Sequence, residues 1–128
     1  MKFAFVACLA LVSCKSEEAA QSPPTPEKKK APSHPWDWEP SDSALVAGKQ
    51  IYLDECAGCH NEGEEGAPAL TKSKEWAKRL EQGLPVLFGH AINGFDGMDG
   101  EMPARGGTPS LTDEEVKNAV LFMVEVSK

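Results

Sequence analysis

The motif CAGCH, residues 56–60, constrains what this chain can fold into more than any other stretch. Cys56 and Cys59 are two residues apart, and His60 follows directly. Two thiols at this spacing can form a disulfide, bind a metal, act as a redox pair or attach a cofactor covalently. The rest of the sequence has to decide among these uses.

The N-terminus has the features of an export signal. Lys2 gives a positive start, and the following apolar run FAFVACLALVS has 11 residues, which suits a signal core and falls short of the roughly 20 residues of a membrane-spanning helix. The run ends in LVSC, which resembles a bacterial lipobox. We therefore expect a signal peptide over residues 1–13 and a lipid anchor on Cys14. An ordinary cleaved signal with an incidental cysteine is the alternative.

These assignments leave only Cys56 and Cys59 for the mature domain, because Cys8 lies inside the signal and Cys14 carries the lipid. Exported proteins usually pair their cysteines, but a bridge across two residues closes a very small loop and constrains little. A zinc site would need four ligands, and the sequence offers no second cysteine pair. A thioredoxin-like pair would follow a strand, and no alternating strand pattern is evident.

Residues 14–40 are rich in Pro, Ser, Lys and Glu and lack apolar periodicity. Such a composition cannot bury enough apolar surface to fold. It predicts a lipidated, disordered tether, and Trp36 and Trp38 are expected to pack on the domain that follows.

From Ser41 the pattern becomes helical, and residues 41–128 are expected to form one domain. Ser41 or Ser43 can cap a first helix, in which Leu45, Gly48, Ile51, Tyr52 and Cys56 recur at helical spacing. Glycine is costly inside a helix, so Gly48 predicts that another helix crosses closely there.

The end of the chain supplies that partner. Thr112 and Glu115 form a capping-box pattern, and a predicted buried stripe follows at Val116, Val120, Met123 and Val124. Two shorter helices are expected between them, over residues 72–83 and 84–94, each ending in glycine. The predicted fold is all-α, with about four helices and a core that looks underfilled.

Charge narrows the choice of partners. The chain has a formal net charge of -7, and residues 41–128 contain 15 acidic and 8 basic residues. An acidic surface repels nucleic acid and favours basic protein partners. The acidic run Glu62, Glu64 and Glu65 follows His60 closely, and it is either a docking surface near the site or an ordinary solvated loop.

Cys-x-x-Cys-His is the attachment pattern of a c-type haem. The two thiols add to the vinyl groups of the porphyrin, and the adjacent histidine ligates the iron. A haem would also fill the underfilled core, and the export signal fits the compartment in which bacteria attach it. We expect one covalent haem, held by Cys56, Cys59 and His60.

The second axial ligand has several candidates: Met98, Met102, Met123, His34 and His90. Met123 is better explained by core packing, and His90 by an ordinary helix position. Met102 precedes Pro103 in a glycine-rich loop that can bring a thioether sulfur over the open haem face, whereas Met98 lies in the same loop without a proline. Met102 is the expected ligand, and His/Met ligation raises the reduction potential relative to two imidazoles.

The segments CAGCH, GAPAL, the Trp and Arg of WAKR, MPARGG and LTDEEVKNAVLFM together resemble a class I cytochrome c, most closely the short bacterial c5-type electron carriers. The resemblance covers about residues 41–128 and leaves the lipobox and tether outside. It implies that the Pro68 carbonyl accepts a hydrogen bond from His60 and that Leu70 packs on the haem edge. It also implies that Trp76 and Arg79 meet a haem propionate. The extra cysteine pair of some c5-type members is absent.

The predicted function is one-electron transfer by a bacterial lipoprotein that faces the periplasm or extracytoplasmic space. We expect an electron-transfer protein rather than an enzyme, and we expect no small-molecule substrate. Two alternatives stay open: a ligand-binding haem domain, such as a gas sensor or peroxidase-like protein, and a haem subunit of a larger oxidoreductase.

Overall fold

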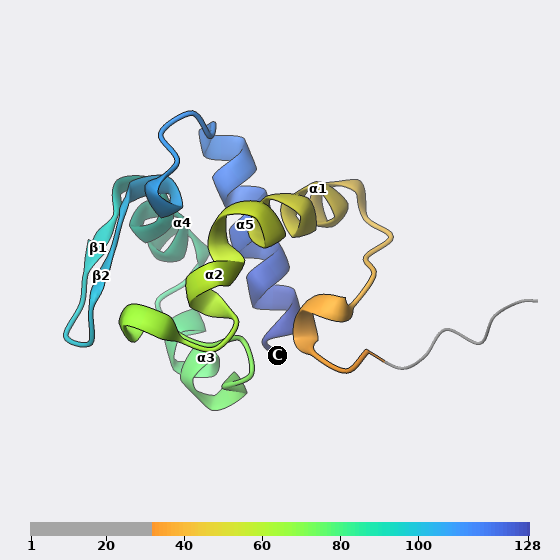
Figure 1. The fold of residues 1–128 in the computed structure, drawn as a ribbon, viewed down its shortest axis with the longest axis horizontal. Helices are drawn as coiled ribbons and strands as arrows, with labels where there is room; N and C mark the ends of the chain where they lie inside the picture. Colours follow the sequence, from red (N-terminus) through yellow and green to blue (C-terminus); the bar gives the residue numbers. More distant parts are fainter. Residues whose placement is uncertain (1–31) are drawn as a thin grey trace, which may run out of the picture.

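The structure, a computed structural model, describes residues 32–128. Helices joined by short loops make up most of this part of the chain (Figure 1). The helices are η1 (Pro35–Asp37), α1 (Ser43–Ile51), η2 (Tyr52–Cys56), α2 (Ala57–His60), η3 (Glu64–Gly66), α3 (Ser73–Leu80), α4 (Leu84–Asn93), η4 (Ala104–Gly107) and α5 (Asp113–Val126), and the strands are β1 (Phe95–Asp96) and β2 (Glu101–Met102). The expected all-α fold is confirmed. No helix among the described residues has the length and apolarity to cross a membrane.

The first helical run begins one residue away from both expected caps. Asp42, rather than Ser41 or Ser43, is the N-cap, because its carboxylate accepts hydrogen bonds from the backbone N–H groups of Ala44 and Leu45. The run then continues without a break through a π-helical turn, η2, into α2. Such turns insert one extra residue and are frequent at functional sites. Here the turn ends at Cys56, and α2, which carries Cys59 and His60, follows directly.

Helices α1 and α5 cross at Gly48, as the sequence predicts. A methyl group at Gly48 would overlap with the backbone carbonyl of Asn118 in α5, so only glycine allows this approach. One turn further on, the buried ring of Tyr52 lies 5.4 Å from that of Phe122. Figure 1 shows α5 running behind α1 through the middle of the molecule.

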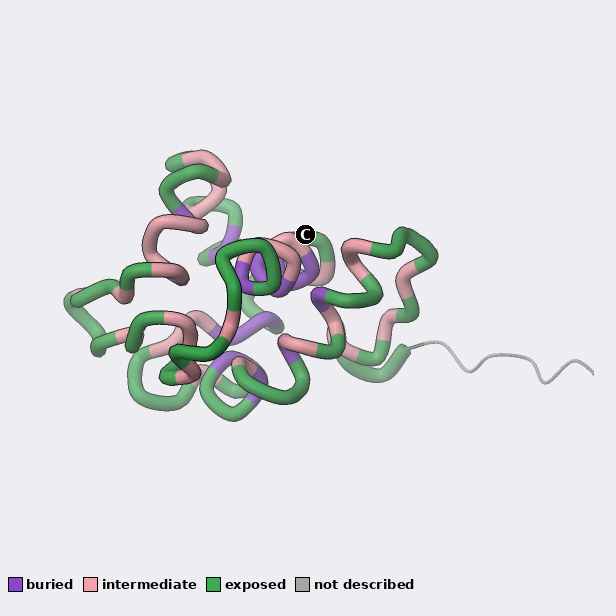
Figure 2. The backbone as a smooth tube through the Cα atoms, turned by 90° about the horizontal axis from the view of Figure 1, so that it is seen from above, coloured by how far each residue is buried: buried purple, intermediate pink, exposed green. Residues whose placement is uncertain are grey.

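Helix α5 has the predicted cap and the predicted buried face. The Thr112 N–H donates to the Glu115 carboxylate at 2.8 Å, and the Glu115 N–H donates to the Thr112 hydroxyl at 3.3 Å. The four residues of the predicted stripe are all buried: Val116, Val120, Met123 and Val124. Buried segments gather toward the middle of the molecule (Figure 2).

Helix α4 matches its expected range, whereas α3 ends at Leu80, three residues before the expected Gly83. Gly83, with φ +85°, is the N-cap of α4, and Gly94, with φ +86°, follows its last residue. This region of φ favours glycine, which explains the glycines at both ends of α4.

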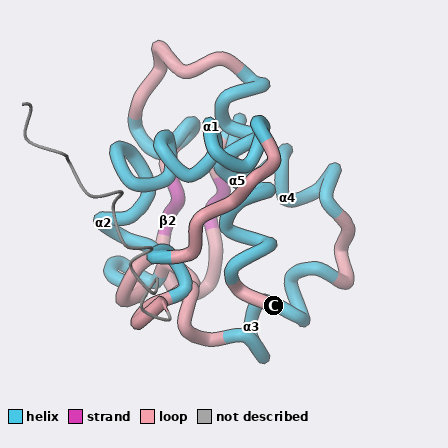
Figure 3. The backbone as a smooth tube through the Cα atoms, turned by 90° about the vertical axis from the view of Figure 1, so that its right-hand side faces the viewer, coloured by secondary structure: helices cyan, strands magenta, loops and turns pink. Residues whose placement is uncertain are grey.

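The expectation that the chain lacks strands is wrong for one short segment. Phe95 pairs with Met102 and Asp96 with Glu101 in a two-stranded antiparallel hairpin, drawn in magenta in Figure 3. Strands of two residues are too short for an alternating pattern to show in the sequence.

The segment before α1 packs on the domain, as expected of its tryptophans. The ring of Trp38 stacks on Phe122 of α5 at 6.3 Å, and Trp36 also contacts the core. The Lys49 ammonium fixes this segment, because it donates to the Trp38 carbonyl at 3.0 Å and pairs with Glu39 at 2.7 Å.

Candidate functional site

A cavity of about 510 Å³ opens beside the CAGCH motif. Its size lies within the roughly 300–1,000 Å³ of cofactor and ligand pockets. Its walls come from the end of η2, from α2 to α5, from the 64–68 loop and from the β1–β2 hairpin. The gap in the core that the sequence predicts is therefore present, and it lies between the attachment motif and the methionine loop.

Cys56 and Cys59 both line this cavity, and neither forms a disulfide. Burial raises the pKa of the Cys56 thiol to about 11, and the charges of Glu55 and Cys59 add to the shift. A thiol with this pKa stays protonated at neutral pH. Both thiols are free and line the cavity, as thioether attachment of a haem requires.

His60 is buried against the same cavity with a defined tautomer. Its Nδ1 lies 3.1 Å from the Pro68 carbonyl, and a carbonyl oxygen only accepts, so Nδ1 carries the proton and Nε2 keeps its lone pair. Burial lowers the pKa of His60, against the opposing effect of the Pro68 hydrogen bond. The neutral imidazole is therefore held as a metal ligand would be.

Three residues named by the family resemblance have other contacts. Leu70 is fully buried in the core but does not line the cavity. The Trp76 indole N–H donates to the Ala69 carbonyl at 2.9 Å, which uses the donor that a propionate would need. Arg79 lines the cavity, although one of its nitrogens donates to the Glu75 carbonyl at 3.1 Å.

Four of the five candidates for the second ligand line the cavity, namely Met98, Met102, Met123 and His90. Met102 is half-buried on β2 and lines the cavity. Met98 lines its outer part, but the side chain is fully exposed. His90 also lines the cavity and stacks on Phe95 at 4.0 Å. Met123 lines it from α5, where its side chain is buried in the core. His34 does not line the cavity and stacks on Trp36.

These residues fit an iron porphyrin. Two free thiols, one buried imidazole with a free lone pair and a thioether all line one pocket. Over residues 32–128, no group of three or more His, Cys, Asp or Glu side chains is placed to hold a metal ion without such a macrocycle.

The family model for cytochrome c matches residues 45–127 of the chain. The chain belongs to the cytochrome c family. Relatives named cytochrome c-555 are 45% identical over 83 residues in Chlorobaculum thiosulfatiphilum (65% of this chain and 96% of that protein) and 46% identical over 83 residues in Chlorobaculum tepidum (65% and 77%). Another, from Prosthecochloris aestuarii, is 40% identical over 84 residues (62% and 85%).

A solved structure supports the same assignment. It is titled as a crystal structure of an electron transfer complex of nitrite reductase with cytochrome c, and the matching chain has a TM-score of 0.57 and 32% identity. The match covers 64% of this chain and 95% of that one. The protein is thus a class I bacterial cytochrome c that carries a covalently bound haem c with its iron and transfers electrons.

Sequence reasoning missed one part of the cytochrome's site. Glycines bring the acidic 64–66 loop against the hairpin, because a methyl group at Gly66 would overlap with the Asp99 carbonyl and one at Gly100 with the Glu65 carbonyl. Glu64, Glu65, Asp99 and Glu101 therefore meet at one edge of the cavity. The dipeptides Asp96-Gly97 and Asp99-Gly100 are turn signals that could have revealed the hairpin.

Proposed function

We propose that this cytochrome is a membrane-tethered electron carrier of the c5 type whose haem iron is ligated by His60 and Met102. The observation that carries the proposal is the shared cavity: the two thiols, His60 and Met102 all line it. When bound, the haem supplies the one-electron chemistry, and the protein supplies ligation, orientation and a dry pocket.

The histidine side is supported by the hydrogen bond to Pro68. It fixes the imidazole ring and makes the remaining nitrogen a stronger donor to iron. Cys56 and Cys59, which line the same cavity, would hold the porphyrin through two thioethers. Trp76, whose ring centre lies 6.4 Å from that of His60, packs against it.

The methionine side is supported by position. Met102 is half-buried and lines the cavity from β2, whereas Met98 is solvent-exposed in the turn of the hairpin and Met123 is buried among the core residues of α5. If His60 and Met102 both held the iron, small molecules would bind it slowly, which would separate a carrier from a gas sensor. We assign Arg79, at the cavity rim, to a haem propionate, and Leu70 to support of the 67–70 segment beneath the haem edge.

The cellular arrangement is also a proposal, and most of it concerns residues 1–31, which lie outside the described part. A signal peptide over 1–13 directs export, lipid on Cys14 anchors the protein, and residues 14–40 tether the haem domain of residues 41–128. The stacking of Trp38 on Phe122 supports a tether whose end rests on the domain. The domain then faces the periplasm or extracytoplasmic space.

The decisive experiment compares visible spectra of the oxidised and reduced protein with those of Met102→Ala. The wild type should show a low-spin haem and the weak far-red band of a methionine–ferric iron bond, and the variant should lose the band and bind carbon monoxide rapidly when reduced. Met98→Ala is the matched control and should resemble the wild type. Rapid carbon monoxide binding by the wild type would instead support a ligand-binding haem domain.

A further inference from the structure

The loop that follows Met102 has little apolar burial to hold it in place. None of the four residues of η4 is buried, and Arg105, Gly106 and Gly107 all have positive φ values, of +55°, +64° and +87°. A loop without buried side chains is easily displaced unless polar contacts fix it.

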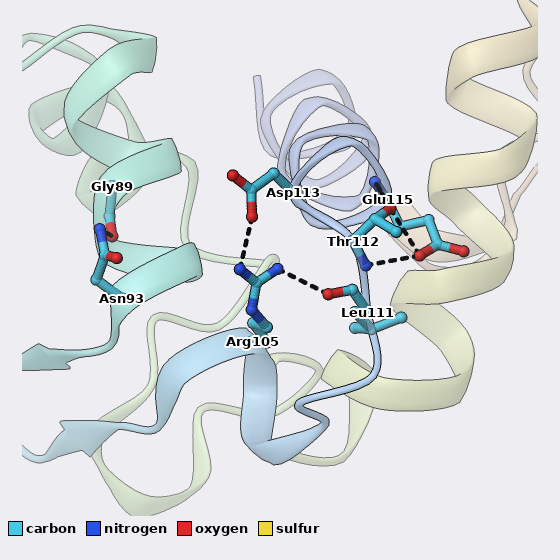
Figure 4. Close-up of polar contacts among 7 residues, drawn as sticks. All are labelled: Gly89, Asn93, Arg105, Leu111, Thr112, Asp113 and Glu115. Carbon is cyan, nitrogen blue, oxygen red and sulfur yellow. Dashed lines mark hydrogen bonds and ion pairs between the residues drawn. The ribbon is translucent and has the colours of Figure 1, made fainter.

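Arg105 supplies such contacts. One guanidinium nitrogen donates to the Leu111 carbonyl at 2.7 Å, and the other pairs with the Asp113 carboxylate at 2.6 Å (Figure 4). Asp113 is the first residue of α5, the helix with the predicted buried stripe. The guanidinium therefore ties the methionine loop to the element that is best anchored in the core.

The backbone conformation of Arg105 is also unusual for this residue type. Arginine is unusual at a φ of +55°, where glycine, asparagine and aspartate are favoured. The side chain reaches Asp113 at the start of α5, and a turn closes around Arg105 because the Gly106 N–H donates to the Pro103 carbonyl at 3.1 Å. Arg105 and Met102 also border the same small void of about 20 Å³ behind the haem cavity, together with Cys56 and Met123.

We propose that Arg105 is a positioning residue that keeps the Met102 sulfur on the haem iron by holding its loop against α5. This inference rests on the His60/Met102 ligation proposed above. A second tie, from the Thr108 hydroxyl to the Glu55 carboxylate at 2.5 Å, joins the far end of the loop to the helix that carries Cys56. Between these two ties, Arg105 is the one that lies closer to Met102 in the chain.

The test is displacement of Met102 by imidazole in the ferric haem-loaded protein, with the far-red methionine band as a second readout. Arg105→Asn tolerates the positive φ but is too short to reach Leu111 and Asp113. Its apparent imidazole Kd should fall about tenfold or more, because both guanidinium contacts are lost and each is a charge-assisted hydrogen bond. Arg105→Lys keeps the charge and should restore part of the wild-type Kd, and it also serves if Arg105→Asn does not accumulate.

Two controls separate positioning from general loosening. Glu125→Gln removes the Lys128–Glu125 ion pair at the other end of α5 and should leave imidazole binding unchanged. In a Met102→Ala background, Arg105→Asn should cause no further fall in Kd, because there is no methionine left to position. An equal fall in that background overturns the proposal.

The remaining outcomes are also distinct. If Met102→Ala alters the band and the imidazole Kd but Arg105→Asn alters neither, ligation stands and the positioning role is wrong. If Met102→Ala alters neither readout, the proposed ligation itself fails, and the role of Arg105 fails with it.

Discussion

Gly48 shows how one hydrogen atom in place of a methyl group permits the crossing of the first and last helices. Alanine normally favours a helix by roughly 1 kcal/mol over glycine. At this position, however, the added carbon would meet the backbone of Asn118 rather than a movable side chain. The helices would have to separate, which disturbs the core on both sides of the crossing.

We therefore expect Gly48→Ala to lower the free energy of unfolding by about 2 kcal/mol or more, as overpacking in a tight core does. Gly89→Ala in α4 is the matched control, because a methyl group there meets no atom within 4 Å; it should be neutral or slightly stabilising. Urea unfolding of the haem-loaded proteins, followed by circular dichroism, measures both. A Gly48→Ala protein as stable as the control would contradict the close crossing.

At the residue scale, residue type and spacing predicted which side chains line the cavity, but not which partner each side chain contacts. Cys56, Cys59, His60 and Met102 line one cavity as expected, because their types and spacing follow from the chemistry of the haem. The propionate assignment of Trp76 is less direct, because its N–H bonds to a carbonyl seven residues away. Spacing alone cannot tell which of several acceptors a side chain will reach.

At the scale of elements, the cap of α5 gives a pH-dependent prediction. Hydrogen bonds from the Thr112 backbone and hydroxyl lower the pKa of Glu115 below its ordinary value of 4.5. Because the folded pKa is the lower one, the carboxylate stabilises the fold above the ordinary value, and this contribution is lost as the pH falls through the folded pKa.

Glu115→Ala should therefore be less stable than the wild type at pH 7, and the difference should shrink below about pH 4.5. Thermal unfolding between pH 3 and pH 7 measures the effect. Glu114→Ala is the control, since its side chain makes no hydrogen bond or ion pair among the described residues; it should destabilise less at pH 7. A difference between Glu115→Ala and wild type that grows on acidification would refute the capping role.

Helices were predictable here where periodicity and caps agreed, as in α5. The π-helical turn at Tyr52–Cys56 was not, because one inserted residue hardly alters a helical pattern. The β1–β2 hairpin was missed because its strands are shorter than any alternation that a sequence can display. Both features border the cavity, so the elements that shape the site are the ones that local patterns describe least well.

At the scale of the whole molecule, the acidic 64–66 loop and the acidic hairpin together place negative charge at one edge of the cavity. Glu64, Glu65, Asp99 and Glu101 share one edge of the cavity, while Lys78 and Arg79 line it from α3. None of these four carboxylates forms an ion pair in the described part of the chain. Such an edge attracts cationic partners by long-range fields, which supports the proposed preference for basic redox proteins.

Charge reversal of Glu64, Glu65 and Asp99 to lysine should slow electron transfer with a cationic ruthenium–ammine complex about tenfold at low ionic strength. Transfer with anionic ferricyanide should become faster, and both changes should vanish near 1 M salt, where charges are screened within about 3 Å. Stopped-flow kinetics measures these rates. Reversal of Glu81, Glu114 and Glu125, which do not line the cavity, is the control, and equal effects from both triple variants would rule out a local docking edge.

The packing of α1 against α5 also has a consequence for the order in which the domain can fold. A polypeptide that emerges N-terminus first presents Cys56 and Cys59 long before Asp113–Val126 appears. Before α5 is available, α1 lacks the helix against which Gly48 packs. The two thiols would thus be accessible to the porphyrin before α5 packs, and docking of α5 against α1 would then complete the domain around the attached haem.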